Sequence, residues 1–395
     1  MSIPNDAKDD IKKYDVSSVK AAEDDDLGQV VHTRPPMNYS SPKGFVESFG
    51  RRWTSIWTRR FTIAIVCGQL VSLCITCTNV TTTELVNRNW ALPTTQSFFL
   101  YLSLFVVYTP YTIYQYGFKG WGNTVLRDGW KYLILAACDV EGNFLVVKAY
   151  QYTDLLSCML LDAWAIPVCM FFSWVYMRPR YHWTQIMGVL ICVAGLGLLV
   201  ASDQITDKDW TALNRAKGDG FMIAGATLYG FTNATEEFFV RKRPLYEVVG
   251  QLGMWGVLVC GIQAASLEHD AMKLASWNGT TIGLLVAFTA AMFILYTLAP
   301  VIYRTASSTY YNLSLLSSDF WGLLFGLFLY HYHPYWLYFV AFIIILGGLI
   351  TYFWYSTPEQ QGETKPVAPS YVNRRRGGED TVSELPALQK DDSAV

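Results

Sequence analysis

Charged residues are scarce in this chain of 395 residues. They make up 16% of the sequence, whereas a soluble protein carries about a quarter, and 52% of the residues are hydrophobic. This shortage argues against an ordinary soluble domain, and the formal net charge of −2 gives no reason to expect a nucleic-acid partner. What the chain does have is 14 Trp, 25 Tyr and 22 Phe, which indicates a polytopic membrane protein with aromatic belts at the bilayer interfaces.

Cysteine is absent from every expected external loop, because all eight cysteines fall inside apolar segments. A disulfide framework is therefore not expected. The stretch Cys74-Ile75-Thr76-Cys77 has the C-x-x-C spacing. In the middle of an apolar segment these cysteines are more simply explained as small packing residues than as a redox or metal site.

The chain also lacks the G-x-S-x-G, H-E-x-x-H and Walker-type phosphate-binding motifs. Its five histidines all lie in expected tails or loops, and the pair His331 and His333 is too small a set to indicate a metal site. The sequence thus predicts no enzyme, no cofactor and no bound metal.

Long apolar stretches predict an all-α polytopic membrane protein with ten transmembrane helices, because about 20 residues are needed to cross a hydrocarbon core of roughly 30 Å. These stretches lie near 61–86, 97–116, 130–150, 153–177, 181–202, 219–240, 245–267, 280–302, 306–330 and 334–356.

The polar segments divide the chain into five parts. We expect a disordered acidic cytosolic tail with an interfacial helix over 1–58, a first five-helix repeat over 59–202, an external linker over 203–218, a second five-helix repeat over 219–356 and a disordered cytosolic tail over 357–395. A plain polar linker is the alternative to the interfacial helix.

Most Lys and Arg residues of the short loops, among them Arg59, Arg60, Arg178 and Arg304, lie on the cytosolic side if the N-terminus is cytosolic. An even number of spans then returns the C-terminus to the same side. Because five helices per repeat is an odd number, the second repeat enters the membrane from the opposite side. The sequence therefore predicts inverted repeats.

Two polar motifs recur at nearly the same offset. Thr78-Asn79-Val80-Thr81 is matched by Thr232-Asn233-Ala234-Thr235, and Asp162-Ala163-Trp164 is matched by Asp319-Phe320-Trp321. Such matched pairs indicate a duplicated bundle with a polar site between its halves, which is typical of secondary transporters.

The two asparagines of the first motif pair are candidates for lining that site. Asn79 belongs to a polar stripe with Gln69, Ser72, Thr76 and Thr83, whose spacing puts them on one helix face. In lipid such a face must turn toward protein or water. Asn79 and Asn233 could equally be interhelical hydrogen-bonding residues, and the two roles are compatible.

The two aspartates of the second motif pair are the best functional candidates. Asp162 and Asp319 could hydrogen-bond a sugar or heterocycle while Trp164 and Trp321 stack on it, or either aspartate could carry a coupling proton. The alternative is a structural aspartate that caps polar groups of a neighbouring helix.

Other polar residues fall within the same expected helices. Tyr150 and Tyr229 could add hydroxyl groups, Asn143 an amide, and Glu141 and Lys148 would tune the local field. For Lys148 the alternative roles are attraction of an anionic group and neutralisation of a nearby aspartate.

Near the cytosolic end of the sixth expected helix, Glu236, Glu237 and Arg241 form either a cytosolic gate or an interfacial salt-bridge cluster.

Three stretches of the sequence resemble a known family: Leu145-Val146-Val147-Lys148-Ala149-Tyr150-Gln151-Tyr152-Thr153; Ala226-Thr227-Leu228-Tyr229-Gly230 with Asn233 and Glu236-Glu237; and Asn312-Leu313-Ser314-Leu315-Leu316 ahead of Asp319. Over about 60–356 the chain resembles the drug/metabolite transporter superfamily and, within it, the F subfamily of the solute carrier 35 family. The resemblance implies ten helices in two inverted repeats, cytosolic termini and a central cavity that opens alternately to each side.

The resemblance suggests two substrate classes. Solute carrier 35 relatives are often nucleotide-sugar antiporters of the Golgi, whereas F-subfamily members have been linked to nucleoside-like metabolites of the queuine/queuosine type. A doubly anionic nucleotide sugar would require several cavity-facing cations. Only Lys148, with Arg304 near a helix end, meets that need, so a neutral or cationic substrate is favoured. A receptor or scaffold that does not transport is the alternative from another class.

The expected partners are thus a small-molecule substrate and the lipid bilayer, in the plasma membrane or in the Golgi and other endomembranes. Small residues such as Gly188, Gly195, Gly347 and Gly348 mark close helix packing, either inside the bundle or in a homodimer.

Overall fold

The computed structural model describes residues 38, 42–56, 59–152, 158, 161–179, 181–205, 215–329, 336–353 and 369. Every regular element in these ranges is a helix, which confirms the predicted all-α class. Most of the two expected tails, most of the expected external linker, and His331 and His333 lie outside the described residues.

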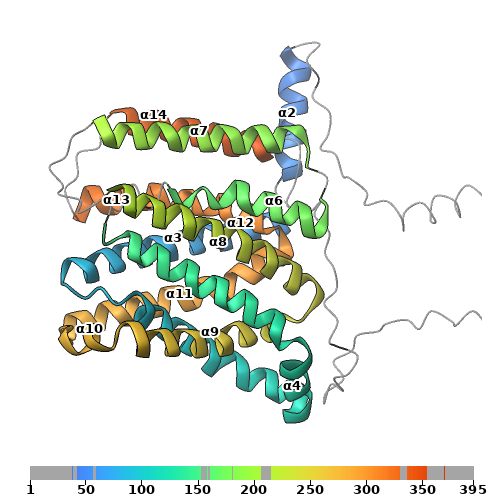
Figure 1. Ribbon diagram of the computed structural model, residues 1–395. Coiled ribbons are helices and arrows are strands. Elements are labelled where there is room, and N and C mark those ends of the chain that lie inside the picture. Colours follow the sequence, from blue (N-terminus) through green and yellow to red (C-terminus); the bar gives the residue numbers. More distant parts are fainter. Residues whose placement is uncertain are drawn as a thin grey trace, which may run out of the picture.

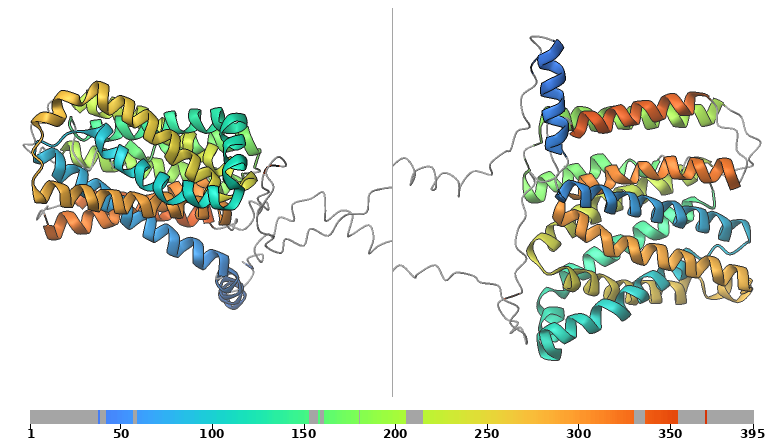
Figure 2. Two further views of the ribbon diagram at one scale, coloured as in Figure 1. Left: turned by 90° about the horizontal axis from the view of Figure 1, so that it is seen from below. Right: turned by 180° about the vertical axis from the view of Figure 1, so that it is seen from behind.

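The helices form a stack of roughly parallel and antiparallel rods, with α2 standing across one end (Figures 1 and 2). α7 and α14 form one outer layer, and α9 lies with part of α4 on the opposite side (Figure 1). In chain order the elements are α2 (Pro42–Ile56), α3 (Arg59–Asn87), α4 (Pro93–Ala149), α6 (Ala165–Met177), α7 (Trp183–Ile205), α8 (Arg215–Lys242), α9 (Leu245–Leu267), α10 (His269–Leu274), α11 (Gly279–Thr305), α12 (Ser308–Leu315), α13 (Ser317–Leu329) and α14 (Trp336–Phe353).

Three of the described helical segments are long and apolar enough to cross a membrane: Thr62–Asn87, Leu245–Leu267 and Gly279–Thr305. Shorter apolar helices cover Ala165–Met177, Trp183–Gly195 and Phe339–Tyr352. Large apolar side chains on the outside of the bundle, such as Val66, Ile262 and Ile343, are more than half exposed, as expected for surfaces that contact lipid. The number of spans, predicted to be ten, remains a prediction.

Helix α4 is broken at Gly117. Its backbone there has φ 71° and ψ 161°, a conformation that glycine adopts at little cost because it has no Cβ. The break divides α4 into two antiparallel arms that remain close, since Tyr101 of the first arm hydrogen-bonds to Asp139 of the second. The spans predicted over 97–116 and 130–150 lie one on each arm.

Helices α7 and α14 approach closely at small residues. A Cβ atom at Gly188 would lie 2.7 Å from the backbone oxygen of Gly348, and one at Gly348 would lie 2.6 Å from Cys192 Sγ. A Cβ at Gly195 would meet Ile345 at 2.9 Å. These three glycines therefore serve packing within the bundle. Gly347, with nothing within 4 Å, faces away from these contacts.

We expect Gly188→Val to loosen the α7–α14 layer, because the added side chain would overlap backbone atoms. Overpacking of this kind lowers the free energy of unfolding by about 1–3 kcal/mol. The melting temperature of the purified protein in detergent should fall by several degrees. The matched control is Gly197→Val on the same helix, where a Cβ meets nothing within 4 Å. Equal melting temperatures for the two variants would contradict this close contact.

Candidate functional site

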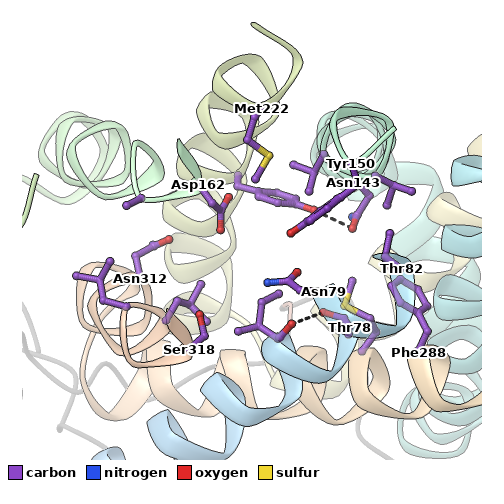
Figure 3. Close-up of a pocket in the computed structure, with 18 of the residues that line it drawn as sticks. Thr78, Asn79, Thr82, Asn143, Tyr150, Asp162, Met222, Phe288, Asn312 and Ser318 are labelled. Atoms are coloured by element: carbon purple, nitrogen blue, oxygen red, sulfur yellow. Dashed lines mark hydrogen bonds between the residues drawn. The ribbon is translucent and has the colours of Figure 1, made fainter. Parts of the chain in front are cut away.

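A cavity lies in the interior, lined by α3, α4, α8, α11, α12 and α13 and by the start of α6 with the residues just before it. Its lining combines apolar side chains such as Phe288 and Met292 with polar ones from both halves of the chain. The polar residues are Thr78, Asn79, Thr82, Asn143, Tyr150, Asp162, Tyr229, Asn312 and Ser318. Figure 3 shows Asn79 and Asp162 projecting into this space from opposite sides. Five of the predicted site residues, Asn79, Asn143, Tyr150, Asp162 and Tyr229, therefore line one cavity.

A second chamber adjoins the first. The two share part of their lining, including Asp162, Tyr229 and Asn312. The second chamber adds Asp139, Asn233, Glu236, Tyr296, Tyr303 and Tyr311, among others. It therefore brings the predicted residues Asn233 and Glu236 close to the first cavity and extends it toward the C-terminal end of α8.

Asp139 is the centre of a buried hydrogen-bond network. Tyr101 Oη and Tyr296 Oη both donate to Asp139 Oδ2, at 2.7 and 2.8 Å. Asn143, one turn along the same helix, donates from Nδ2 to these two hydroxyl oxygens at 2.9 and 3.1 Å. Its Oδ1 accepts a hydrogen bond from Tyr229 Oη at 2.9 Å. The network joins both arms of α4 to α8 and α11, and its outer members form part of the cavity wall.

The two repeat-related asparagines have different surroundings. Asn233 Nδ2 donates to Asn312 Oδ1 at 3.1 Å, and Asn233 Oδ1 accepts from Tyr303 Oη at 3.0 Å. It thus links helices and lines the second chamber at once. Asn79 lines the first cavity, and its backbone oxygen accepts from Thr83 Oγ1 at 2.9 Å.

Glu237 and Arg241 form a buried ion pair on α8. Arg241 Nη2 lies 2.7 Å from Glu237 Oε1, and the two side chains are 8% and 2% exposed. Arg241 also donates to the backbone oxygen of Ala306 at 3.1 Å. Glu237 Oε2 accepts from the backbone nitrogen of Ser308 at 2.9 Å and from the Ser308 hydroxyl group. The pair therefore fastens α8 to the start of α12, next to Glu236 of the second chamber.

The predicted stacking residues lie apart from both cavities. Trp164 is 46% exposed, and its Nε1 donates to Thr227 Oγ1 at 3.2 Å. Trp321 Nε1 donates to Gln69 Oε1 at 3.4 Å. Neither indole is among the described residues that line the chambers. Asp319 lies on α13, but its side chain is outside the described part of the structure.

Lys148 and Glu141 also lie off the cavity lining. Lys148 Nζ is 5.0 Å from the centre of the Phe144 ring and 6.0 Å from that of Phe221, which is a cation–π arrangement. Glu141 accepts a hydrogen bond from Gln263 on α9. The chamber walls in the described structure contain no Lys, Arg or His.

Sequence reasoning missed several important members of the site. Tyr101, Tyr296, Tyr303 and Asn312 hold its polar groups in place, yet tyrosine is common throughout this chain and its positions gave no periodic signal. Asp139 offered a signal, since it stands one helical turn before Asn143 in an apolar segment.

Comparisons with known proteins agree with this architecture. The family model SLC35F, described as solute carrier family 35, matches residues 57–354. An uncharacterized solute carrier family 35 member of Schizosaccharomyces pombe is 46% identical over 74% of this chain, although the match spans only 58% of that protein's length. Solute carrier family 35 member F2 of Mus musculus is 36% identical over 81% of this chain and 86% of its own.

A likeness to a solved structure extends to the fold. One crystal structure aligns with a TM-score of 0.55 over 74% of this chain and 96% of its own, at 18% sequence identity. The family match covers most of the helices described above, and the relatives are solute carriers, which are membrane transporters. From its helices, its polar interior and these matches, we conclude that the chain belongs to solute carrier family 35, in the group described by the SLC35F model.

Proposed function

We propose that this protein moves a small polar metabolite across its membrane by alternating access. The observation that carries the proposal is the pair of adjoining polar chambers inside a bundle whose outer surface is apolar. Such a surface suits lipid, and an interior polar cavity suits a solute held near the middle of the bilayer.

The helix packing supports ten spans arranged as two inverted five-helix repeats. Under this proposal α3 corresponds to α8, and the second arm of α4 corresponds to α11. The observed contact of α3 with α11 then matches that of α8 with α4, and the contact of α3 with α13 matches that of α8 with α6. In the contacting pairs α7–α14 and α4–α9, the two partners are themselves equivalent helices of the two repeats, so each pair would lie across the twofold axis. A twofold arrangement of the halves would produce this pattern.

We propose cytosolic termini on the basis of charge. α3 begins at Arg59, and α6, α8 and α11 end beside Arg178, Arg241 and Arg304. The start of α3 and the ends of α6 and α8 lie on the side of the bundle where α2 stands (Figure 1), and Arg304 contacts the end of α8 through the backbone oxygen of Val240. The positive-inside rule assigns such a side to the cytosol. α2 would then lie along the cytosolic membrane surface, with its exposed Phe45 and Phe49 toward lipid.

The substrate we propose is nucleoside- or nucleobase-like, of the queuosine/queuine type. The first cavity offers amides, hydroxyl groups and a carboxylate, which can match the donors and acceptors of a heterocycle and a ribose. The absence of Lys and Arg from the described chamber walls counts against a diphosphate group. Asp162, whose Oδ1 is buried without a hydrogen-bond partner among the described residues, is the strongest candidate to bind this substrate.

Counterflow uptake into proteoliposomes tests this proposal. The panel is labelled nucleobases, nucleosides including queuosine, and nucleotide sugars. We expect exchange of a nucleoside or nucleobase, and a fall of about tenfold or more in Asp162→Asn, because a hydrogen bond to a charged group contributes about 1.5–3 kcal/mol. Asp319→Asn, measured in the same assay, tests whether the acid that matches Asp162 in the second motif also takes part in transport.

The matched control is Asp270→Asn. The Asp270 side chain is 93% exposed and lines neither chamber, so this variant should transport as the unmodified protein does. Exchange of a nucleotide sugar would replace the proposed substrate with that of a Golgi antiporter. Silence across the panel from folded protein would favour a receptor or scaffold.

We propose that the Glu237–Arg241 pair is the cytosolic gate, closed in this structure. Cys169 reports on it, since its side chain is fully buried and its Sγ lies 3.1 Å from the hydroxyl oxygen of Ser308, the residue that Glu237 binds. In protein with Cys169 as the sole cysteine, Arg241→Gln should speed maleimide labelling by about tenfold or more, because an unpaired buried carboxylate destabilises the closed end by several kcal/mol.

The control for the gate is Arg88→Gln, which removes an exposed arginine at the opposite end of the bundle. It should label at the original rate. Slow labelling of Arg241→Gln, in protein that elutes as a folded species, would show that the pair is not a gate.

A further inference from the structure

The second chamber has an unusual charge composition. Three carboxylates line it, Asp139, Asp162 and Glu236, and its described lining contains no basic side chain. These acids come from three separate segments and do not converge as ligands of a metal ion: the described residues hold no group of three His, Cys, Asp or Glu with that geometry. A single positive charge, rather than a divalent metal, would suit this chamber.

Glu236 and Asp162 are the two acids of this chamber that have a buried oxygen without a hydrogen-bond partner among the described residues, and of the two only Glu236 lies outside the first cavity. Glu236 is 6% exposed, and its unpartnered atom is Oε1. Asp139 receives two tyrosine hydroxyl groups, and the adjacent Glu237 is paired with Arg241. Burying a carboxylate without such partners is unfavourable, so an intramembrane acid in this position is a candidate for a function.

Among the described residues, the titratable groups that share the chamber with Glu236 supply no positive charge. Those that share its chamber are Asp139 from α4, Asp162 from the segment before α6, Tyr229 from α8 itself, Tyr296 and Tyr303 from α11, and Tyr311 from α12. Cys169 of α6 donates to Ser308, and Glu247 of α9 accepts from Tyr116 and Tyr132, so both are engaged elsewhere. Arg241 is bound to Glu237 and Ala306.

We propose that Glu236 binds one monovalent cation, a proton or a sodium ion, that crosses the membrane together with the substrate. The inference rests on the proposed function for its transport step. Asp162 lies on the wall shared by the two chambers, whereas Glu236 lines only the second, so substrate in the first and cation in the second can be present at once. Neutralising Glu236 removes the cost of enclosing its charge. The loaded protein can then change conformation, while the unloaded protein is held back.

Cation binding is tested on the purified full-length protein without substrate. Its melting temperature is followed while sodium chloride is titrated against choline chloride at constant ionic strength, and separately while the pH is lowered. A ligand that binds the folded state raises the melting temperature. We expect one of the two cations to raise it by several degrees in the unmodified protein and in Glu84→Gln, a control acid that pairs with Arg88 on α3, and to have little effect on Glu236→Gln.

Coupling is tested in proteoliposomes with labelled queuosine, or whichever solute of the panel exchanges. We expect an inward pH or sodium gradient to accumulate the solute at least severalfold in the unmodified protein and in Glu84→Gln. Glu236→Gln should keep counterflow within about twofold and lose accumulation. Glu236→Asp, which restores the carboxylate, should recover part of it.

The outcomes separate the two proposals. Failure of counterflow in the unmodified protein refutes the proposed substrate, and the melting series still decides whether Glu236 binds a cation. Counterflow without accumulation under either gradient overturns the coupling. So does accumulation by Glu236→Gln that equals the unmodified protein, or loss of counterflow in a Glu236→Gln protein that melts normally, since Glu236 would then serve substrate binding instead.

Discussion

A polar side chain inside this bundle must find its partner within the protein, because lipid offers none. The network around Asp139 shows how strongly that constraint determines the fold. One carboxylate oxygen accepts hydrogen bonds from the hydroxyl groups of Tyr101 and Tyr296. The Asn143 amide donates to the same two hydroxyl oxygens and accepts a hydrogen bond from the Tyr229 hydroxyl group. Four helical segments are thereby held at fixed rotations about their axes, and the faces left over enclose the chambers.

The same constraint separates structural polar residues from candidate functional ones. Asn233, Asn312 and Tyr303 satisfy one another and keep α8, α11 and α12 in contact. Asp162 and Glu236, in contrast, each have a buried oxygen without a described partner. Several other buried polar atoms are also without a described partner, but among the described residues that line the chambers the unpartnered carboxylates are these two, which is why we propose ligand roles for them.

Much of this arrangement could be predicted from sequence. Apolar length gave the helices, and the repeated Thr-Asn and Asp-x-Trp motifs pointed to Asn79, Asn233 and Asp162. Periodicity identifies which residues share a helix face, but it does not fix what that face meets. Trp164 follows Asp162 by two residues, which turns its ring away from the cavity toward Thr227. The tyrosine partners of Asp139 come from distant segments of the chain, and a single sequence does not show which distant residues will contact each other.

The break at Gly117 and the role of Lys148 show the same limit. Gly117 has a positive φ of 71°, which the residues on either side of it in the sequence do not predict. Lys148 looked like a counter-charge because the sequence places it near acids, whereas its ammonium group lies over aromatic rings. In both cases the outcome depends on tertiary neighbours that local patterns leave open.

The turn at Gly117 also bears on how the protein is made. If both arms of α4 span the membrane, as we propose, the short turn between them would let them leave the ribosome and enter the lipid as one helical hairpin. Asp139 on the later arm would cost about 2.5–3.5 kcal/mol to insert alone. Within the hairpin it meets the Tyr101 hydroxyl group of the earlier arm. The acid would then not enter the hydrocarbon core without a hydrogen-bond partner during synthesis. A residue other than glycine at position 117 would therefore be expected to lower the efficiency of membrane insertion as well as transport.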